Sequence, residues 1–489
     1  MTANRVSRLL SASVAALTAA SLAGCAVGPN YHRPTAPVPA TFKELEGWRP
    51  ARPADAIDRG QWWTIFGDPD LDALEAKVVI SNQNIAAAEA AYRAARALVA
   101  ENRASYFPTV DLNAGATDSG GRTTQTTIVG GGSGSGGSGS SGKNSNARYT
   151  ASVGASWAPD LWGRVRRAVE GARASAQASA ADLANARLSA QAELASDYLQ
   201  LRADDEQIRL LQRSAEGYQK ALQVAQNRYN AGVAAKSEIL SAQTQLYNAQ
   251  ASIQSTTQAR QVLEHAIAML TGQPPASLTI APKPFDLKIP TVPVSVPSEL
   301  LERRPDVAAA ERRAANANAQ IGVQVAAYYP TLNLSASYGF TSTTLGQLFS
   351  SGGWTLGLQA AETLFDGGAR KARVNQAKAQ YDQAVAQYRQ AVLNAFQQVE
   401  DGLAAQRYLE AQDALRRKSS AAADQAEQIV VNQYRAGQAS STDVVTAENT
   451  ALAARQALIT TQRDRLTATV SLIEALGGGW SAAELPKKP

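Results

Sequence analysis

The chain has 489 residues, with 47 Lys or Arg against 42 Asp or Glu, and this near balance of charge gives no argument for a nucleic-acid partner. A single cysteine excludes a disulfide framework and a thiolate metal site. The two histidines, His32 and His265, form no visible nucleophile–base pair or metal-ligand spacing. We therefore expect neither an enzyme nor a cofactor or metal site.

The N-terminus has the pattern of a secretory signal. Two arginines precede the apolar run Leu9–Leu22, and small residues lead to Cys25. Ending on Cys, the segment resembles a bacterial lipobox, which implies removal of the signal peptide 1–24 and a covalent lipid on Cys25. Ala26 after the Cys favours, by the same resemblance, sorting to the outer membrane; the alternative is an ordinary signal peptide with an incidental Cys. No later apolar run has the roughly 20 residues of a membrane helix, so a membrane-crossing part would consist of strands.

Residues 25–72 are rich in Pro and Trp, which indicates an extended, acylated N-terminal segment that wraps around another part of the protein. An Ala-rich helix is predicted over Leu74–Ser105. The strand Pro108–Thr117 follows, because apolar residues there occupy alternate positions. A run made only of Gly and Ser, Gly130–Gly142, predicts a flexible loop before the next alternating strand, Tyr149–Trp157.

Long helices then dominate. Good helix formers extend from Val165 to Arg228, a helix roughly 95 Å long, and again from Lys236 to Met269. A Pro-rich linker at 273–297 follows, so residues 73–272 form a first repeat.

The second half repeats the first. Tyr106-Phe107-Pro108-Thr109 returns as Tyr328-Tyr329-Pro330-Thr331, and Tyr229-Asn230-Ala231-Gly232 returns as Tyr434-Arg435-Ala436-Gly437. Residues 298–480 are thus a second repeat, followed by a tail at 481–489. The elements of this second repeat are predicted as a helix 298–327, strands 330–341 and 354–360, a helix ending near Gln433 and a last helix ending at 476. Arg303–Asp306 should open the first of these helices. Val385, Val392 and Val399 recur every seven residues, as in a coiled-coil seam.

Four alternating strands of about ten residues suit a bilayer crossing, but four strands cannot close a barrel, and open edges are not tolerated in hydrocarbon. The chain must therefore oligomerise. Two copies would supply eight strands and three would supply twelve, and the strands alone do not choose.

These features together resemble the outer-membrane factor family of TolC-like channels, in particular its NodT-type efflux lipoproteins. The resemblance covers nearly the whole mature chain and is carried by Cys25–Tyr31, Arg303–Val307 with Glu311, Tyr329–Thr331, Tyr434–Gly437 and Ala475–Trp480.

The resemblance implies an α+β membrane protein. Its homotrimer would form a 12-stranded β-barrel, four strands per protomer, continuous with a 12-helix periplasmic α-barrel and a mixed equatorial region. It also implies a passive exit duct of a tripartite efflux pump in the outer membrane. Its partners would be outer-membrane lipid, a periplasmic adaptor and an inner-membrane transporter, commonly of the resistance-nodulation-division (RND) class.

Family gate residues carry over only in part. Tyr434 and Asp443 match the gate tyrosine and a gate carboxylate, whereas Ala439 and Thr446 stand where the family has Arg and Asp. Glu448 is a candidate second charge that would face differently on the helix. The alternative for Asp443 is a helix cap after Ser440. The candidate adaptor contacts are the tips Asn230, Ala231, Gly232, Arg435, Ala436 and Gly437.

Two other functions are considered. A duct for type I protein secretion would have the same fold, but the lipobox and the ending Gly477-Gly478-Gly479-Trp480 favour efflux. A structural coiled-coil surface lipoprotein would need neither alternating strand pairs nor duplicated tips. The sequence does not identify the cargo.

Overall fold

The computed structural model describes residues 26–39, 41–45, 61–121, 144–286, 289–290 and 303–486. The predicted signal peptide, Cys25 and the Gly/Ser run lie outside the described residues. Contacts divide the chain into two compact units, which we describe separately. One comprises Met1–His32, Ala97–Arg173 and Ala315–Tyr381; the other comprises Arg33–Arg96, Ala174–Ala314 and Asp382–Pro489.

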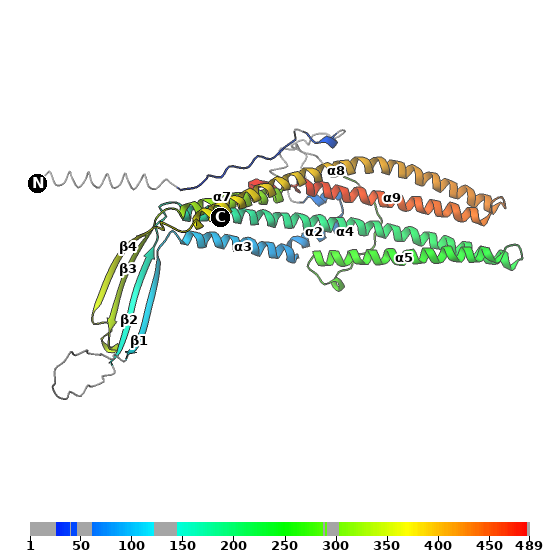
Figure 1. Ribbon diagram of the computed structural model, residues 1–489. Coiled ribbons are helices and arrows are strands. Elements are labelled where there is room, and N and C mark those ends of the chain that lie inside the picture. Colours follow the sequence, from blue (N-terminus) through cyan, green and yellow to red (C-terminus); the bar gives the residue numbers. More distant parts are fainter. Residues whose placement is uncertain are drawn as a thin grey trace, which may run out of the picture. The chain divides into compact units, whose positions relative to one another are not determined.

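The first unit contains an antiparallel sheet in the order β1-β2-β3-β4, shown in Figure 1. All four predicted strands are confirmed, with ends that differ by a few residues. Their bounds are β1 Thr109–Gly121, β2 Asn144–Trp157, β3 Thr331–Ser342 and β4 Gly352–Ala361.

The beginning of the described chain is fastened to the first unit by a buried arginine. The Arg167 guanidinium donates to the carbonyls of Val27 and Gly28, both at 3.2 Å, and to Asn30 Oδ1 at 2.9 Å. Gly28 has a φ of 94°, and a Cβ there would lie 2.5 Å from the Cα of Gly322. Only glycine combines this backbone angle with so close an approach.

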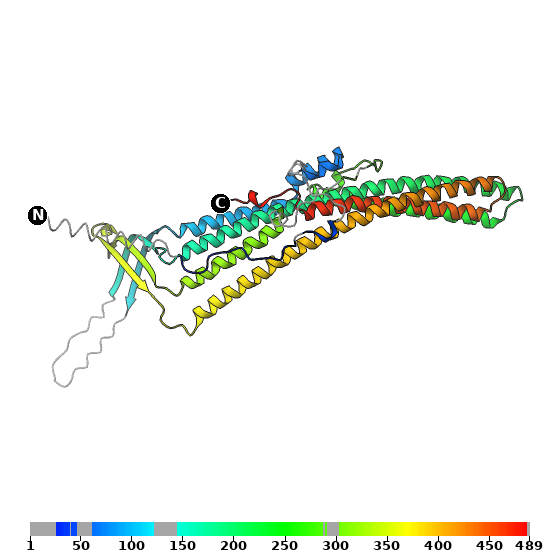
Figure 2. The same cartoon turned by 90° about the horizontal axis from the view of Figure 1, so that it is seen from above.

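The second unit is mainly helical. Aligned helices lie side by side in it, α4 with α5 and α8 with α9, as Figures 1 and 2 agree. The helices of the chain are α2 Pro69–Ser81, α3 Gln83–Ala104, α4 Arg164–Asn230, α5 Lys236–Leu270, α7 Pro305–Ala326, α8 Ala369–Arg435 and α9 Ser441–Ala475.

Side-chain contacts give the order of the long helices within this unit. Arg260 of α5 binds Asp205 of α4, and Tyr218 of α4 binds Asn449 of α9. Thr469 of α9 accepts a bond from Gln406 of α8 at 2.8 Å. The order is therefore α5, α4, α9, α8.

The continuous helix predicted over Leu74–Ser105 is wrong. The chain forms α2 and α3, separated by Asn82 in an extended conformation. The Asn82 Oδ1 accepts from the amides of Asn84 at 2.9 Å and Ile85 at 3.2 Å, so it caps α3. Asp68 accepts from the Asp70 amide and starts α2 earlier than expected.

The two repeats use equivalent positions to join a returning helix to the next one. Asn82 Nδ2 donates to the carbonyl of Leu270, the last residue of α5, at 2.9 Å. Arg304, the equivalent of Asn82, donates to the carbonyl of Ala475, the last residue of α9, at 2.9 Å. The predicted helix start at Pro305 is confirmed. Residues 291–302, where the helix was expected to begin, lie outside the described residues.

The valine seam predicted on α8 is confirmed, because Val385, Val392 and Val399 are all buried. The N-terminal segment packs on α8 beside this seam, because Phe42 and Phe396 belong to the same buried cluster as Val392 and Val399. Phe42 packs on Phe396 with ring centroids 6.4 Å apart, and the carboxylate of Glu400 accepts the amides of Lys43 and Glu44.

Buried charges fix the linker between the repeats. Arg202 donates to the carbonyl of Ala281 at 2.7 Å, and Arg260 donates to that of Ile280 at 2.5 Å. Both arginines bind the carboxylate of Asp205, which also accepts the amide of Lys283. The linker therefore crosses α4 and α5 at a fixed place.

Candidate functional site in the sheet and the helix tips

The sheet has one apolar and one polar face. A row of apolar residues crosses all four strands through the pairs Leu112–Val153, Val153–Tyr338 and Tyr338–Trp354. Leu112 is 78% exposed and Trp354 is 77% exposed. Such large exposed apolar side chains, gathered on one face, suit contact with lipid.

The next row, on the opposite face, has only small and polar residues: Asn113, Ser152, Gly339 and Gly353. A wall with one apolar and one polar face separates hydrocarbon from water. Within the described residues, β1 and β4 each pair with one neighbour, so both outer edges of the sheet remain open to a further strand.

Aromatic residues mark the junction of strand and helix. Trp162 stacks on Tyr329 with centroids 4.8 Å apart, and its indole donates to the carbonyl of Pro330 at 2.8 Å. Trp157 donates to the carbonyl of Tyr106. Trp and Tyr concentrate at membrane–water interfaces, where their polar atoms find partners.

The helix tips are two similar turns. α4 and α8 each end in a turn whose glycine, Gly232 or Gly437, has a φ near 75° (74° and 76°). All six predicted tip residues are exposed: Asn230, Ala231, Gly232, Arg435, Ala436 and Gly437. Their predicted contact with an adaptor remains a prediction.

Tyr434 of α8 is held by an arginine of the other helical hairpin, the one that α4 and α5 form. Its hydroxyl accepts from Arg228 Nη1 at 2.6 Å, and the same guanidinium nitrogen lies 3.6 Å from the Glu238 carboxylate. One arginine thus connects the ends of α4 and α8 and the start of α5. The sequence interpretation missed Arg228. The equivalent residue of the second repeat is Gln433, but the tips also differ at Asn230 and Arg435, so the sequence alone does not single out Arg228.

Asp443 forms a capping box with Ser440. Its carboxylate accepts from the Ser440 amide at 2.9 Å and hydroxyl at 2.7 Å, while its own amide donates to the Ser440 hydroxyl at 3.2 Å. These hydrogen bonds, the hydroxyl's first, lower the pKa of Asp443. The capping alternative is confirmed, and a gate role for the same exposed carboxylate stays a prediction.

Glu448 has different surroundings from Asp443. It lines a cavity of about 340 Å³ together with Tyr218 of α4, Glu427 of α8 and Arg455 of α9. Its Oε2 is buried without a hydrogen-bond partner among the described residues. Burial, and then the nearby charge of Glu427, raises the pKa of Glu448. Asp443 and Glu448 therefore do not form one acidic group within the chain.

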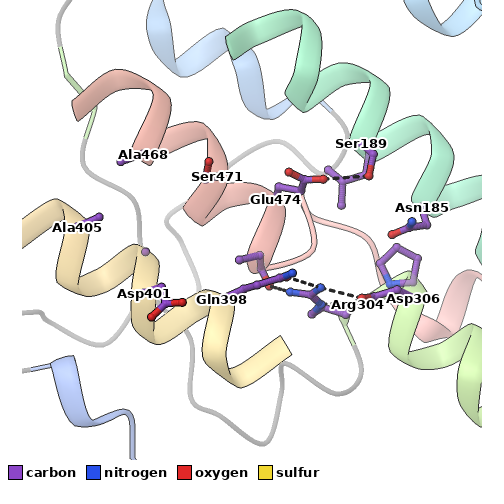
Figure 3. Close-up of a pocket in the computed structure, with 14 residues that line it drawn as sticks. Asn185, Ser189, Arg304, Asp306, Gln398, Asp401, Ala405, Ala468, Ser471 and Glu474 are labelled. Carbon is purple, nitrogen blue, oxygen red and sulfur yellow. Dashed lines mark hydrogen bonds and ion pairs between the residues drawn. The ribbon is translucent and has the colours of Figure 1, made fainter. Parts of the chain in front are cut away.

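A larger cavity, of about 560 Å³, lies beside the joint between α9 and α7 (Figure 3). Arg304 projects into it and binds Asp306 at 2.7 Å and Gln398 at 2.8 Å. Ser189 donates to Glu474 at 2.9 Å, and burial raises the pKa of Glu474. Most polar groups here bind one another, and no predicted site residue lines the cavity.

No helix in the described part of the chain combines the length and the hydropathy needed to span a bilayer. The same residues contain no group of three or more His, Cys, Asp or Glu that could hold a metal ion.

A family model described as outer membrane efflux protein matches residues 76–273 and 296–478. The chain belongs to the outer membrane efflux protein family. A probable efflux pump outer membrane protein of Pseudomonas putida, TtgC, is 32% identical over 474 residues, which are 95% of each chain. The predicted family, the role in efflux and the outer-membrane location are thereby confirmed.

Solved structures of outer-membrane channels have the same fold as this outer membrane efflux protein. The channel OprN is 30% identical, with a TM-score of 0.83 over 93% of this chain and 100% of that chain. The open state of the MtrE channel of Neisseria gonorrhoeae is 28% identical, with a TM-score of 0.79 over 94% and 99%. The family is one of channels and not of enzymes.

Proposed function

We propose that three copies of the chain close their sheets into one 12-stranded barrel, continuous with a 12-helix tube. The observation that carries this proposal is the four-stranded sheet with two open edges and one apolar face. Hydrocarbon tolerates no open edge, so a sheet that crosses it must be completed by further copies. Three is the number that the family resemblance implies.

In this assembly the channel conducts cargo passively, and the driving energy comes from an inner-membrane transporter. α4 and α8 have 67 residues each, which corresponds to a length of roughly 100 Å. We assign their exposed tips to contact with a periplasmic adaptor and the transporter to the RND class.

The cargo that we propose is small organic molecules. One relative is named for toluene efflux and another for pyoverdine export. Toluene and pyoverdine are both small molecules compared with a protein. These names favour efflux over the alternative of type I protein secretion. The proposal names no single compound.

We assign the gate to the helix tips. The bond between Arg228 and Tyr434 ties the two hairpins of one chain together. Three copies of the exposed Asp443 around a narrow axis would form a ring that attracts cations. Glu448, buried in its cavity, contributes to the packing of the hairpins and not to the ring.

The proposed anchor is a lipid on Cys25, and no other cofactor is required. In the described chain, Val27 donates its amide to the carbonyl of Trp162 at 3.1 Å. Residues immediately after Cys25 are therefore held at the strand–helix junction, where the proposed lipid-facing sheet meets the helices that lie in water.

Two arginine variants of one strand test which face of the sheet meets lipid. Leu356 is 72% exposed on the apolar face of β4, and its neighbour Thr355 lies on the opposite face. A charge on the lipid face of a barrel costs about 2–4 kcal/mol near the bilayer midplane, whereas a charge facing the lumen costs less. We expect Leu356→Arg to reduce insertion and channel current in planar bilayers, and Thr355→Arg to preserve both. Loss of current in Thr355→Arg alone would contradict the proposed wall.

A further inference from the structure

Basic residues concentrate at the start of both long helices, α4 and α8, next to the sheet. Four of the first 13 residues are basic in each helix: Arg164, Arg166, Arg167 and Arg173 in α4, and Arg370, Lys371, Arg373 and Lys378 in α8. Neither helix has an acidic residue in its first turn. Positive charge at a helix N-terminus opposes the helix dipole, so the stability of the helices does not account for this placement.

Two of the basic positions recur in both repeats. α4 and α8 have 67 residues each and align from first to last without gaps. In this alignment Arg166 corresponds to Lys371, and Arg173 corresponds to Lys378. The two positions are seven residues apart and therefore lie on one face of the helix. Lys371 and Lys378 are exposed, and in the described part of the chain neither forms an ion pair.

In the first repeat the arginines of this face gather around Tyr106. The Tyr106 amide donates at 3.0 Å to the carbonyl of Arg103, which lies in the last turn of α3. α3 and α4 lie side by side in Figures 1 and 2. Burial, and then the charge of Asp160, raises the pKa of Tyr106. Three nearby guanidinium groups act in the opposite direction, those of Arg166, Arg173 and Arg103.

One carboxylate balances only part of this charge. Asp160 Oδ2 lies 3.6 Å from Arg166 Nε. Glu170, the other acid near the start of α4, is paired with a different arginine. Arg103 and Arg173 form no ion pair within the residues that the structure describes, and Arg173 is exposed. Three arginines therefore face a single carboxylate, and the cluster can bind a further anion.

The arginine cluster lies at the edge of the apolar face of the sheet. Trp157 ends β2 on the same face as Val153, because the two positions are four residues apart in a strand. The Trp157 indole donates to the Tyr106 carbonyl at 3.0 Å. Trp157 is 39% exposed and Phe107 is 71% exposed. An anion held by the cluster would therefore lie where the apolar face ends and the helices in water begin.

We propose that Arg103, Arg166 and Arg173 bind the headgroup phosphate of an anionic phospholipid, whose acyl chains lie against the apolar face of the sheet. Lys371 and Lys378 form the corresponding site of the second repeat. Arginine binds phosphate through strong, charge-assisted hydrogen bonds, and basic residues beside a membrane segment attract anionic lipid. This inference rests on the proposed membrane-crossing barrel and adds the class of lipid that the barrel binds at its periplasmic end.

Glutamine variants of the full-length protein test both sites in detergent. The thermal midpoint is measured against added phosphatidylglycerol, which is anionic, and against phosphatidylcholine, which is zwitterionic. A lipid that binds the folded protein raises the midpoint as its concentration rises above the Kd. The first variant is Arg103→Gln with Arg173→Gln, and the second adds Lys371→Gln and Lys378→Gln.

The matched control removes the same charge from the same two helices, at a distance from the cluster. It is Arg93→Gln with Arg187→Gln, and both of these arginines are exposed. Arg93 lies roughly 15 Å from Arg103 along α3, and Arg187 lies roughly 21 Å from Arg173 along α4. A general effect of net charge would change the control as much as the first variant.

We expect phosphatidylglycerol to raise the midpoint of the wild type and of the control more than phosphatidylcholine does, and high salt to weaken this preference. The first variant should lose about half of the preference, because one of two sites per chain remains, and the second variant should lose all of it.

A wild type that responds equally to the two lipids, or a first variant that matches the control, overturns the proposed lipid site. A wild type that inorganic phosphate stabilises as much as phosphatidylglycerol does overturns it too, because the cluster then binds free phosphate. Current in planar bilayers is measured separately. A wild type that conducts without a lipid preference leaves the proposed duct intact, whereas a wild type that carries no current contradicts the duct itself.

Discussion

Replacing Asp205 with Asn should strongly destabilise the second unit. The Asp205 carboxylate is buried, accepts Arg260 Nε at 2.5 Å and Arg202 Nη1 at 3.1 Å, and also binds the Lys283 amide. The substitution removes the carboxylate that both guanidinium groups share and leaves Arg260 with Glu264 alone and Arg202 with Asp70 alone. Removing one partner of a buried ion pair costs about 3–5 kcal/mol.

The assay is thermal unfolding of the solubilised protein at constant scan rate. At about 2 °C per kcal/mol, appropriate to a large chain, the midpoint should fall by about 6–10 °C. A surface control is Arg213→Ala, because Arg213 is mostly exposed and lies 3.6 Å from Glu206. Such a pair contributes at most about 1 kcal/mol. An Asp205→Asn midpoint no lower than that of this control would refute the reasoning.

The adjacent Asp204 provides a matched control with the opposite expectation. Burial raises the pKa of Asp204 to about 6, and its Oδ2 has no hydrogen-bond partner among the described residues. A carboxylate with a raised folded-state pKa lowers stability as pH rises from its unfolded pKa, near 4, to its folded one. Asp204→Asn should therefore stabilise the protein increasingly from pH 4 to pH 6, with a constant gain above that. A destabilised Asp204→Asn at pH 8 would contradict this assignment.

Three further changes test other parts of the account. Burial, and then the charge of Asp72, raises the pKa of Glu75 to about 9, so the wild-type protein should lose stability between about pH 4.5 and 9. Glu75→Gln should gain in thermal midpoint over the same range; a pH-independent difference would argue against a buried neutral acid. Asp443→Ala should increase conductance or weaken cation preference in planar bilayers, whereas unchanged currents would leave Asp443 with its capping role alone. Cys25→Ala should abolish acylation as measured by mass spectrometry, and a lipid still attached to that variant would contradict the lipobox interpretation.

Local patterns in the sequence predicted the repeating parts of the fold. Strict alternation located all four strands, because a half-exposed strand needs opposite chemistry on its two faces. Val385, Val392 and Val399 identified the buried face of α8 by their spacing. The break at Asn82 was missed, although Asn is a favoured residue at the start of a helix. Asn82 caps α3 by local bonds and also donates to the carbonyl of Leu270, far away in the chain.

The site was predicted less completely than the fold. Tyr434 was recognised from its motif, but its partner Arg228 lies in the other repeat and becomes visible only when the two tips meet. No sequence motif identifies Asp205 as a buried ion-pair residue, because its partners lie in three separate segments: α4, α5 and the linker. Such contacts depend on the packing of distant segments, which periodicity and composition do not encode.

The most direct test of the central claim is the mass of the full-length protein after gentle extraction in detergent, measured by light scattering with the detergent contribution subtracted. The account predicts the mass of three chains: four-stranded sheets with open edges must be completed by other copies, and three is the number that the family resemblance implies. The mass of a single chain would contradict the shared barrel, and with it the proposed duct.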